Sequence, residues 1–154
     1  MNNRRLHNFE VITKESLKVL KLLLKREQLC YDDIDIQIHP YFGIFDKNKN
    51  LLAGYGLEVY GTDALLRSVV VNKNYRKNGL GNIIIKHAID YGRTNGIKYY
   101  YLLTTTADSF FSKFEFNVIE RHSVPNRIAS TTEFRTFCPD TAICMKLTLK
   151  NNSK

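Results

Sequence analysis

A basic turn that contains two glycines is the feature that most constrains how this chain folds. The turn, R-K-N-G-L-G at residues 76–81, follows an apolar strand pattern at residues 65–71 and opens a helical pattern at residues 80–95. Glycines let a ligand approach the backbone closely, and the first N–H groups of a helix have no partners within the helix. The helix dipole favours negative charge at the same place. The turn therefore predicts a site for an anionic phosphate group.

The helical pattern that follows the turn has one apolar stripe with small residues in it, as expected for a helix that packs closely on a sheet. Asn95 and Gly96 then supply a C-terminal stop. The stripe consists of Gly81, Ile84, Ile85, Ala88, Ile89 and Gly92.

Residues 69–81, V-V-V-N-K-N-Y-R-K-N-G-L-G, resemble the acetyl-CoA-binding motif of the GNAT superfamily of N-acetyltransferases. Lys77 replaces a glycine that is common in the motif, but both glycines of the turn are present. The resemblance implies acetyl-CoA as cosubstrate and no metal. The residues that it assigns to cosubstrate binding are Val69, Val70, Val71, Arg76, Lys77, Asn78, Gly79, Leu80, Gly81 and Asn82.

Further stretches extend the resemblance. Residues 101–116 resemble the fifth strand and the following helix of the GNAT fold. Residues 133–145, with L-L-R-S at 65–68 and T-T-T-A at 104–107, are similar to the arsenic-resistance N-acetyltransferase subgroup. The implied fold class is α/β (α+β): the GNAT fold, a mixed sheet of about six to seven strands flanked by helices, with two splayed parallel strands at its centre.

Length and composition favour a single domain at residues 1–150 followed by a polar tail at 151–154. A chain of 154 residues with 44% hydrophobic residues suits one core. No apolar run approaches the ~20 residues of a membrane span, and no signal-peptide core follows the start. We therefore expect a cytoplasmic location and no membrane partner.

A net charge of +8 raises the question of nucleic-acid binding. The basic residues are spread along the chain and do not gather on one face interleaved with aromatic residues. The tyrosines at 99–101 are followed by two leucines, which favours a buried strand over a stacking platform. We expect no nucleic-acid partner, and the positive charge helps to recruit the anionic coenzyme.

Three cysteines, Cys30, Cys138 and Cys144, occur without a C-x-x-C pair, so a disulfide scaffold is not expected. One interpretation is three reduced, partly buried thiols. The other is that Cys138 and Cys144 bind a soft species such as trivalent arsenic.

The pattern along the chain predicts three helices and seven strands without repeats or linkers. The first helix is capped by Thr13, and a polar hairpin turn occupies residues 46–50. The insert at residues 121–135 either covers the acceptor pocket or is an ordinary surface loop. The predicted strands are 8–12, 41–45, 51–60, 64–71, 99–104, 117–120 and 141–149, and the predicted helices are 13–29, 80–95 and 109–113.

The resemblance implies direct attack by an amine on the thioester of acetyl-CoA, polarised by a backbone N–H beside Val69 or Val71. The amine must lose a proton, and Glu58, on a strand beside the cleft, is the candidate base; its alternative is an exposed strand residue. His122 and Glu133 are weaker candidates.

Two further positions lie in or next to the helix predicted at residues 109–113. Phe111 stands where the superfamily often has a tyrosine that protonates the leaving thiolate, so no general acid is assigned unless Tyr101 substitutes. Asp108 is expected to cap the helix at 109–113.

The acceptor is expected to be a small molecule with a free amine and an anionic end. Arg67 alternates with Val69 and Val71, so it either grips a substrate carboxylate or pairs with a nearby acid; Arg135 is a second candidate for the substrate. An organoarsenical amino acid is included by subgroup resemblance only. A protein N-acetyltransferase and a non-catalytic acyl-CoA-binding module are the alternatives, and a homodimer is left open.

Overall fold

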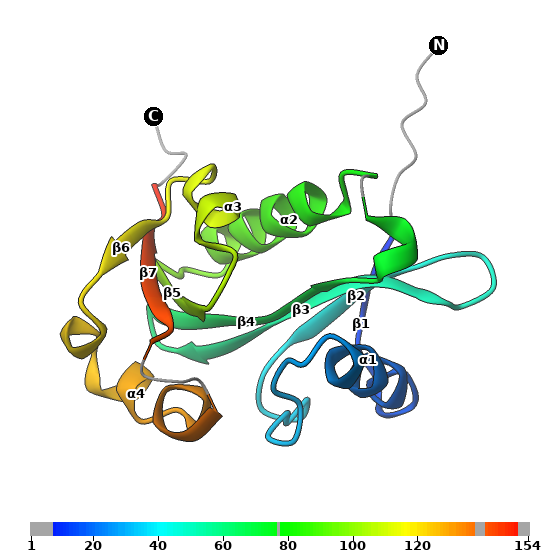
Figure 1. Ribbon diagram of the computed structural model, residues 1–154, viewed down its shortest axis with the longest axis horizontal. Coiled ribbons are helices and arrows are strands. Elements are labelled where there is room, and N and C mark those ends of the chain that lie inside the picture. Colours follow the sequence, from blue (N-terminus) through cyan, green and yellow to red (C-terminus); the bar gives the residue numbers. More distant parts are fainter. Residues whose placement is uncertain (1–7, 77, 138–140, 151–154) are drawn as a thin grey trace, which may run out of the picture. The chain divides into compact units, whose positions relative to one another are not determined.

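The computed structural model describes residues 8–76, 78–137 and 141–150. A seven-stranded sheet runs through them in the order β1-β2-β3-β4-β5-β7-β6 (Figure 1). Strands β4 and β5 are parallel, whereas β1 with β2, β2 with β3, β5 with β7 and β6 with β7 are antiparallel. The strands are β1 (Phe9–Val11), β2 (Tyr41–Phe45), β3 (Leu51–Tyr60), β4 (Asp63–Val71), β5 (Tyr99–Thr104), β6 (Asn117–Ile119) and β7 (Ile143–Thr148).

Helices occupy the connections between these strands, and several are only one turn long. The α-helices are α1 (Lys14–Arg26), α2 (Leu80–Thr94), α3 (Asp108–Ser112) and α4 (Asn126–Ala129). The 3-10 helices are η1 (Lys73–Tyr75) and η2 (Arg121–Ser123), and η3 (Glu133–Phe137) is a π-helix.

Strands β2, β3 and β5 and the start of α2 have the predicted bounds, and Thr13 caps α1 as predicted. Its hydroxyl oxygen accepts from the Ser16 N–H at 3.4 Å, and the Ser16 hydroxyl oxygen accepts from the Thr13 N–H at 2.8 Å. Helix α1 ends earlier than predicted, at Arg26, because Gln28 has a left-handed φ of 61°. Residue 29 is therefore outside the helix.

The prediction that Asp108 caps α3 is wrong. The N-cap residue is Ala107, without a side-chain hydrogen bond, and Asp108 is the first residue of the helix. Its carboxylate still lies in the first turn, where the helix dipole favours negative charge. The apolar spacing therefore located the helix, but it did not locate the cap.

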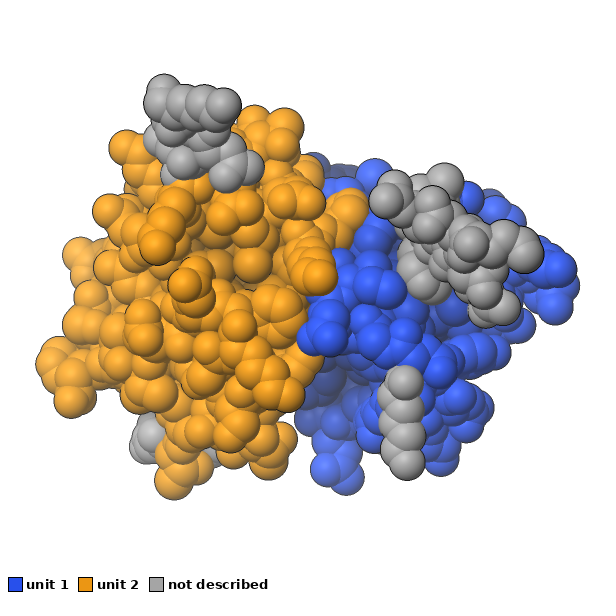
Figure 2. All heavy atoms as spheres, turned by 90° about the horizontal axis from the view of Figure 1, so that it is seen from above, with its two compact units in different colours: residues 1–56, 68–84 blue, residues 57–67, 85–154 orange. Residues whose placement is uncertain are grey.

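Contacts divide the chain into two compact units, each made of two stretches (Figure 2). Unit 1 comprises Met1–Gly56 and Ser68–Ile84, and unit 2 comprises Leu57–Arg67 and Ile85–Lys154. The expectation of a single domain at residues 1–150 stays a prediction.

Unit 1 has a core between α1 and the first strands. Leu20 and Leu24 of α1 are completely buried, one turn of helix apart, and they pack with Tyr41 of β2 and Leu51 of β3. Val70 of β4 joins the same cluster. This face of α1 therefore lies against the core, and burying two leucines contributes on the order of 3–6 kcal/mol before entropy is counted.

Unit 2 is built around β5 and β7, with α3 on one face of these strands and α4 on the other (Figure 1). A Cβ at Gly92 of α2 would lie 2.5 Å from the Tyr100 hydroxyl oxygen, so only glycine permits this close approach. On the α4 side, Ile128 and Phe134 pack with Leu65 and Cys144. The insert at 121–135 is thus folded into short helices with buried side chains.

None of the helices in the described part of the chain combines the length and the hydropathy that a membrane span requires.

Candidate functional site

The turn after β4 is anchored at its beginning and at its end, both within unit 1. The Asn72 N–H donates to the Leu52 carbonyl oxygen at 2.8 Å, and the Asn72 side chain accepts from the Asn74 N–H at 3.1 Å to cap η1. At the other end Leu80, the first residue of α2, is buried. Lys77 lies outside the described residues. The described residues on both sides of it are thus held by hydrogen bonds or by burial.

Gly79 supplies the conformation on which the turn depends. Its φ is +74°, a left-handed value that side chains other than glycine adopt at a cost, and a Cβ built there would meet nothing within 4 Å. The space beside this backbone is therefore open. The Gly79 carbonyl oxygen accepts from the Ile83 N–H at 3.2 Å, which starts the hydrogen bonding of α2. The N–H groups of Leu80 and Gly81 belong to the first turn, where a helix offers them no acceptor.

Arg76 lies at the beginning of this turn, and its guanidinium forms an ion pair with Glu27, the C-cap residue of α1. The Arg76 side chain is 53% exposed. An arginine in this position adds positive charge to the open helix N-terminus, and its fork of donors suits phosphate oxygens. These residues, all in unit 1, fit the anionic phosphate group that the sequence predicts.

The far half of β4 departs from simple strand geometry. The register pairs between β4 and β5 begin at Asp63 and Tyr99 and end at Leu65 and Tyr101, although β4 continues to Val71. Ser68 has a left-handed φ of 58°, which breaks the alternation of side chains along the strand. The predicted alternation of Arg67 with Val69 and Val71 is therefore wrong as a geometric argument.

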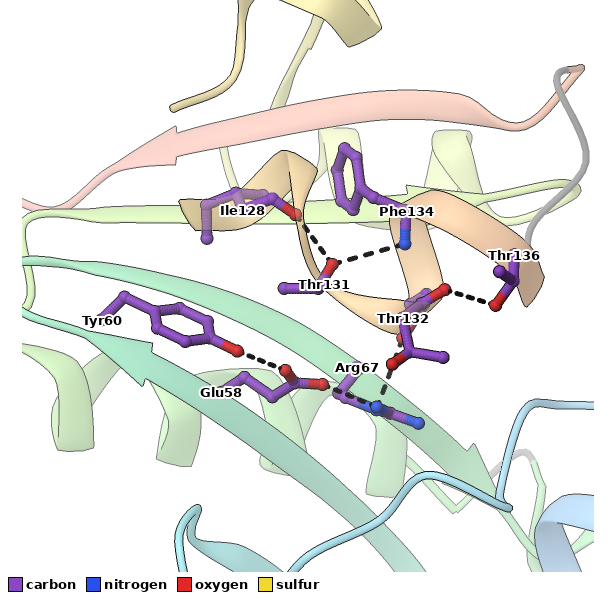
Figure 3. Close-up of polar contacts among 9 residues, drawn as sticks. Glu58, Tyr60, Arg67, Ile128, Thr131, Thr132, Phe134 and Thr136 are labelled. Atoms are coloured by element: carbon purple, nitrogen blue, oxygen red, sulfur yellow. Dashed lines mark hydrogen bonds and ion pairs between the residues drawn. The ribbon is translucent and has the colours of Figure 1, made fainter. Parts of the chain in front are cut away.

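A buried charged network lies in unit 2, on β3, β4 and η3 (Figure 3). Arg67 Nη1 donates to Glu58 Oε2 at 2.6 Å, and Arg67 Nε lies 3.4 Å from Glu133 Oε2. The Tyr60 hydroxyl donates to Glu58 Oε1 at 2.6 Å. The Arg67 side chain is 0% exposed, and the two glutamate side chains are 10% and 9% exposed. One cation thus faces two carboxylates in a nearly dry environment.

This network contains most of the buried polar residues of the described chain. Among the described residues, four that are polar or charged are buried: Glu58, Arg67, Thr131 and Glu133. Three of them take part in the network or in the π-helix that carries it, and the fourth, Thr131, fixes the start of that helix. Its hydroxyl donates to the Ile128 carbonyl oxygen at 2.7 Å and accepts from the Phe134 N–H at 3.3 Å (Figure 3). π-helical turns are rare and are frequent at functional sites.

The structure shows the surroundings of the three residues that the sequence offers as candidate bases. Glu58 is buried and paired, so the alternative of an exposed strand residue is wrong. Glu133 contacts the same arginine as Glu58. The His122 side chain is 84% exposed, and its Nδ1 lies 3.9 Å from Glu120 Oε2. The network thus brings Glu58 and Glu133 together.

The remaining predicted residues lie in varied surroundings. Arg135 is exposed on η3. Phe111 is buried, with ring contacts to Phe110 and Phe116 at centroid distances of 5.2 and 5.6 Å. Burial raises the pKa of Tyr101 to about 12, and nearby Asp63 adds to the increase.

The two described cysteines are thiols and not disulfides. Burial raises the pKa of Cys144 to about 11, against a smaller lowering by Arg121. A thiol with this pKa is almost entirely protonated near pH 7, which opposes its use as a soft ligand. Cys138 lies outside the described residues, so the predicted pair of thiolates stays a prediction.

Tyr60 is the one member of the network that the sequence analysis missed. It lies two residues after Glu58 on the same strand, and side chains at that spacing share a face of the sheet. That periodicity was sufficient to place the hydroxyl near the carboxylate. The path of η3, which brings Glu133 to Arg67, has no comparable pattern in the sequence.

Comparison with known proteins agrees with this architecture. The model of the acetyltransferase (GNAT) family matches residues 13–116. The chain therefore belongs to the acetyltransferase (GNAT) family, and its mixed α/β sheet, with β4 and β5 parallel at the centre, is the GNAT fold. A search of curated proteins finds no match to this sequence.

Solved structures with the same fold have low sequence identity to this chain. An N-acetylglutamate synthase from Neisseria gonorrhoeae, complexed with coenzyme A and N-acetyl-glutamate, is similar with a TM-score of 0.79 at 14% identity. The match covers 94% of this chain and 35% of the synthase, so the chain spans about a third of that protein's length. A GNAT-family acetyltransferase from Staphylococcus aureus gives a TM-score of 0.73 at 17% identity, covering 93% and 99% of the two chains.

The ribosomal-protein-S18-alanine N-acetyltransferase from Escherichia coli is also similar, with a TM-score of 0.68 at 17% identity and 96% coverage of both chains. Proteins that acetylate quite different acceptors, judging by their names, thus have this fold. The likeness establishes the fold and leaves the acceptor to be argued from the residues of this chain.

Proposed function

We propose that this protein transfers the acetyl group of acetyl-CoA to the primary amine of a small, amino-acid-like molecule, by direct attack within a ternary complex. The observation that carries the proposal is the anchored turn at the start of α2. Its left-handed Gly79 has open space beside it, and Arg76 stands at its entrance. This arrangement suits a diphosphate better than it suits any uncharged ligand.

Cosubstrate binding would use the backbone of unit 1. The N–H groups at the first turn of α2 and the guanidinium of Arg76 would hold the diphosphate of coenzyme A. Val69, Val70 and Val71 of β4 would offer backbone groups to the pantetheine amides, and one backbone N–H would polarise the thioester carbonyl. The left-handed Ser68 just before them supports this role because it interrupts the regular strand at that point.

The acetyl transfer itself requires one proton to leave the amine. The amine nitrogen attacks the carbonyl carbon of the thioester, the carbon–sulfur bond breaks, and the coenzyme leaves as a thiolate. Glu58 would accept the ammonium or amine proton, directly or through a water molecule. Its buried position, with two donors fixing its oxygens, supports this role. We assign no general acid: Phe111 has no proton to give, and the thiolate would take one from water or from the amine.

Recognition of the acceptor would rest on Arg135 for an anionic end, since this arginine is exposed on η3. Arg67, the other candidate, is enclosed by two carboxylates. An organoarsenical amino acid is a narrower form of the same proposal and rests on the subgroup resemblance of residues 133–145. A cytoplasmic location and a homodimer are likewise proposals, to be tested by cell fractionation and by light scattering.

The test is a titration followed by a turnover assay. We expect calorimetry to detect acetyl-CoA binding and a thiol reagent to detect coenzyme A release when acetyl-CoA is mixed with a suitable amine from an amino-acid panel. The same mixture without amine is the control for hydrolysis. Binding without release across the panel would instead indicate an acyl-CoA-binding module, and the absence of both would reject the proposal. Release only with peptides or proteins would indicate a protein N-acetyltransferase.

A further inference from the structure

The surroundings of Arg67 are unsuited to binding a substrate carboxylate. Its side chain is completely buried, Nη1 contacts Glu58 at 2.6 Å, and Nε lies 3.4 Å from Glu133. No part of the Arg67 side chain is exposed, so a substrate carboxylate could reach it only by opening the network, which would leave a buried charge uncompensated. Such an uncompensated charge is strongly unfavourable.

The geometry instead connects the arginine to the proposed base. Glu58 has two oxygens, one contacted by Arg67 and the other by the Tyr60 hydroxyl. Because each donor contacts a different oxygen of the carboxylate, together they restrict rotation of the Glu58 side chain. Arg67 also contacts Glu133, and in this way it ties the π-helix η3 to strands β3 and β4 of unit 2.

We propose that Arg67 is a positioning residue that orients Glu58 for proton transfer and does not itself bind the acceptor. This inference rests on the proposed function, because it takes Glu58 as the base. It differs from a purely structural role for Arg67, in which the guanidinium only balances the buried charge of the two glutamates.

A charge-balanced double variant separates these roles. The network carries one positive and two negative groups, a net charge of −1 (1 − 2 = −1). In Arg67→Met with Glu133→Gln, only Glu58 remains charged, so the net charge is again −1. Arg67→Met alone removes the cation that both carboxylates contact and should lower the midpoint of thermal unfolding. In the double variant, the midpoint of thermal unfolding should return most of the way to the wild-type value.

Activity is expected to behave differently from stability. If Arg67 positions Glu58, the double variant should keep its acetyl-CoA affinity within about twofold, but kcat should remain roughly 10- to 100-fold below wild type, the size of effect that a misplaced group has. Recovery of kcat to within about twofold would overturn the proposal. Glu133→Gln alone keeps the Glu58–Arg67 pair, so it should lose less kcat than the double variant; an equal or larger loss would overturn the proposal.

Direct substrate binding by Arg67 is tested by a matched pair of acceptors. The probes are amino acids and their carboxamides, which differ only in the anionic end. If Arg67 positions Glu58, the double variant should lose the same fraction of kcat with an amino acid and with its carboxamide. A loss confined to KM, present for the amino acid and absent for its carboxamide, would overturn positioning in favour of a direct contact.

A readout that needs no activity keeps this inference separate from the proposed function. In a crystal structure of the double variant, we expect the Glu58 carboxylate to leave its present position or to occupy several. An unchanged, single orientation would overturn the proposal even if no acceptor is found. If wild type binds no acetyl-CoA, the proposed function fails, whereas the orientation of Glu58 still decides the role of Arg67.

Discussion

Two arginines, one in each unit, are both paired with glutamate, yet they differ in burial. Arg76 of unit 1 pairs with Glu27, and its side chain is 53% exposed; Arg67 of unit 2 is 0% exposed between two carboxylates. An exposed ion pair is worth about 0–1 kcal/mol, so a ligand phosphate readily replaces the carboxylate. Opening a buried pair costs about 3–5 kcal/mol because it strands a charge. Burial therefore decides which arginine is available to an anionic ligand.

The largest expected effect is in unit 2. Replacing the proposed base, Glu58→Gln, should lower kcat by about 10²- to 10⁴-fold, the usual contribution of a general base. The fold should be retained, because Arg67 keeps Glu133 as its partner. Steady-state kinetics with calorimetry for acetyl-CoA would measure this.

Glu120→Gln, an exposed glutamate of the same unit, is the matched control and should leave kcat unchanged. If Glu58→Gln keeps a kcat within threefold of wild type, Glu58 is not the base, and the contrast between a catalytic unit 2 and a binding unit 1 is lost.

In unit 1 the corresponding change is Gly79→Val. A side chain at the left-handed φ of +74° costs about 1–2 kcal/mol of stability and fills the open space beside the turn. Loss of one charge-assisted hydrogen bond to phosphate, about 1.5–3 kcal/mol, would weaken acetyl-CoA binding by about 10- to 100-fold. Calorimetry and thermal unfolding measure the two effects separately.

Gly96→Val provides a close control for this strain. Gly96 has a φ of +76°, also with nothing within 4 Å of a built Cβ, but it follows the other end of α2. It should lose similar stability while acetyl-CoA affinity stays the same. Equal losses of affinity in both variants would mean that strain, and not the loss of backbone approach, explains the Gly79 result.

A smaller and opposite effect is expected from Glu27→Gln. This change removes the carboxylate that competes for Arg76, so acetyl-CoA should bind up to about fivefold more tightly, the equivalent of an exposed ion pair of about 1 kcal/mol. Glu10→Gln, which breaks another exposed pair with Lys49, should not change the affinity. Weaker binding in Glu27→Gln would show that the glutamate positions Arg76 and does not compete with the ligand.

The smallest effect concerns the two described cysteines. Because burial raises the pKa of Cys144 to about 11, only about a thousandth of it is thiolate at pH 8, and this fraction rises about tenfold per pH unit up to that pKa. We expect iodoacetamide to label the half-buried Cys30 of unit 1 well before Cys144. Peptide mass spectrometry in a Cys138→Ser background measures both sites. Rapid labelling of Cys144 at pH 8 would show that its thiolate is accessible and would support the hypothesis that it binds a soft species.

Local patterns predicted much of the fold because their causes are local. The bounds of β2, β3 and β5 followed from runs of β-forming residues between turns. The hydroxyl and spacing at Thr13 predicted the N-cap of α1. Helix ends were less well predicted, as at Arg26, because the last turn depends on the dihedral angles of one or two residues.

The candidate site was predictable in part. The sequence identified Glu58, Arg67 and Glu133 as chemically important, but it offered an exposed carboxylate and a substrate-gripping arginine as separate possibilities. Tyr60 was within reach of the same reasoning through its spacing from Glu58. The contact between Arg67 and Glu133 joins residues far apart in the sequence. Glu133 lies in a π-helix, and no periodic pattern in the sequence predicts that helix.

The sequence by itself determined the order of the seven strands and of helices α1, α2 and α3, the phosphate-type turn at the start of α2 and the class of enzyme that this turn resembles. These follow from interactions between residues close together in the chain. Only the tertiary structure decided that Arg76 is open to solvent while Arg67 is enclosed by two carboxylates. Charge is a property of the residue, whereas desolvation is set by whatever the rest of the chain packs around it, and desolvation determines what a charge can bind.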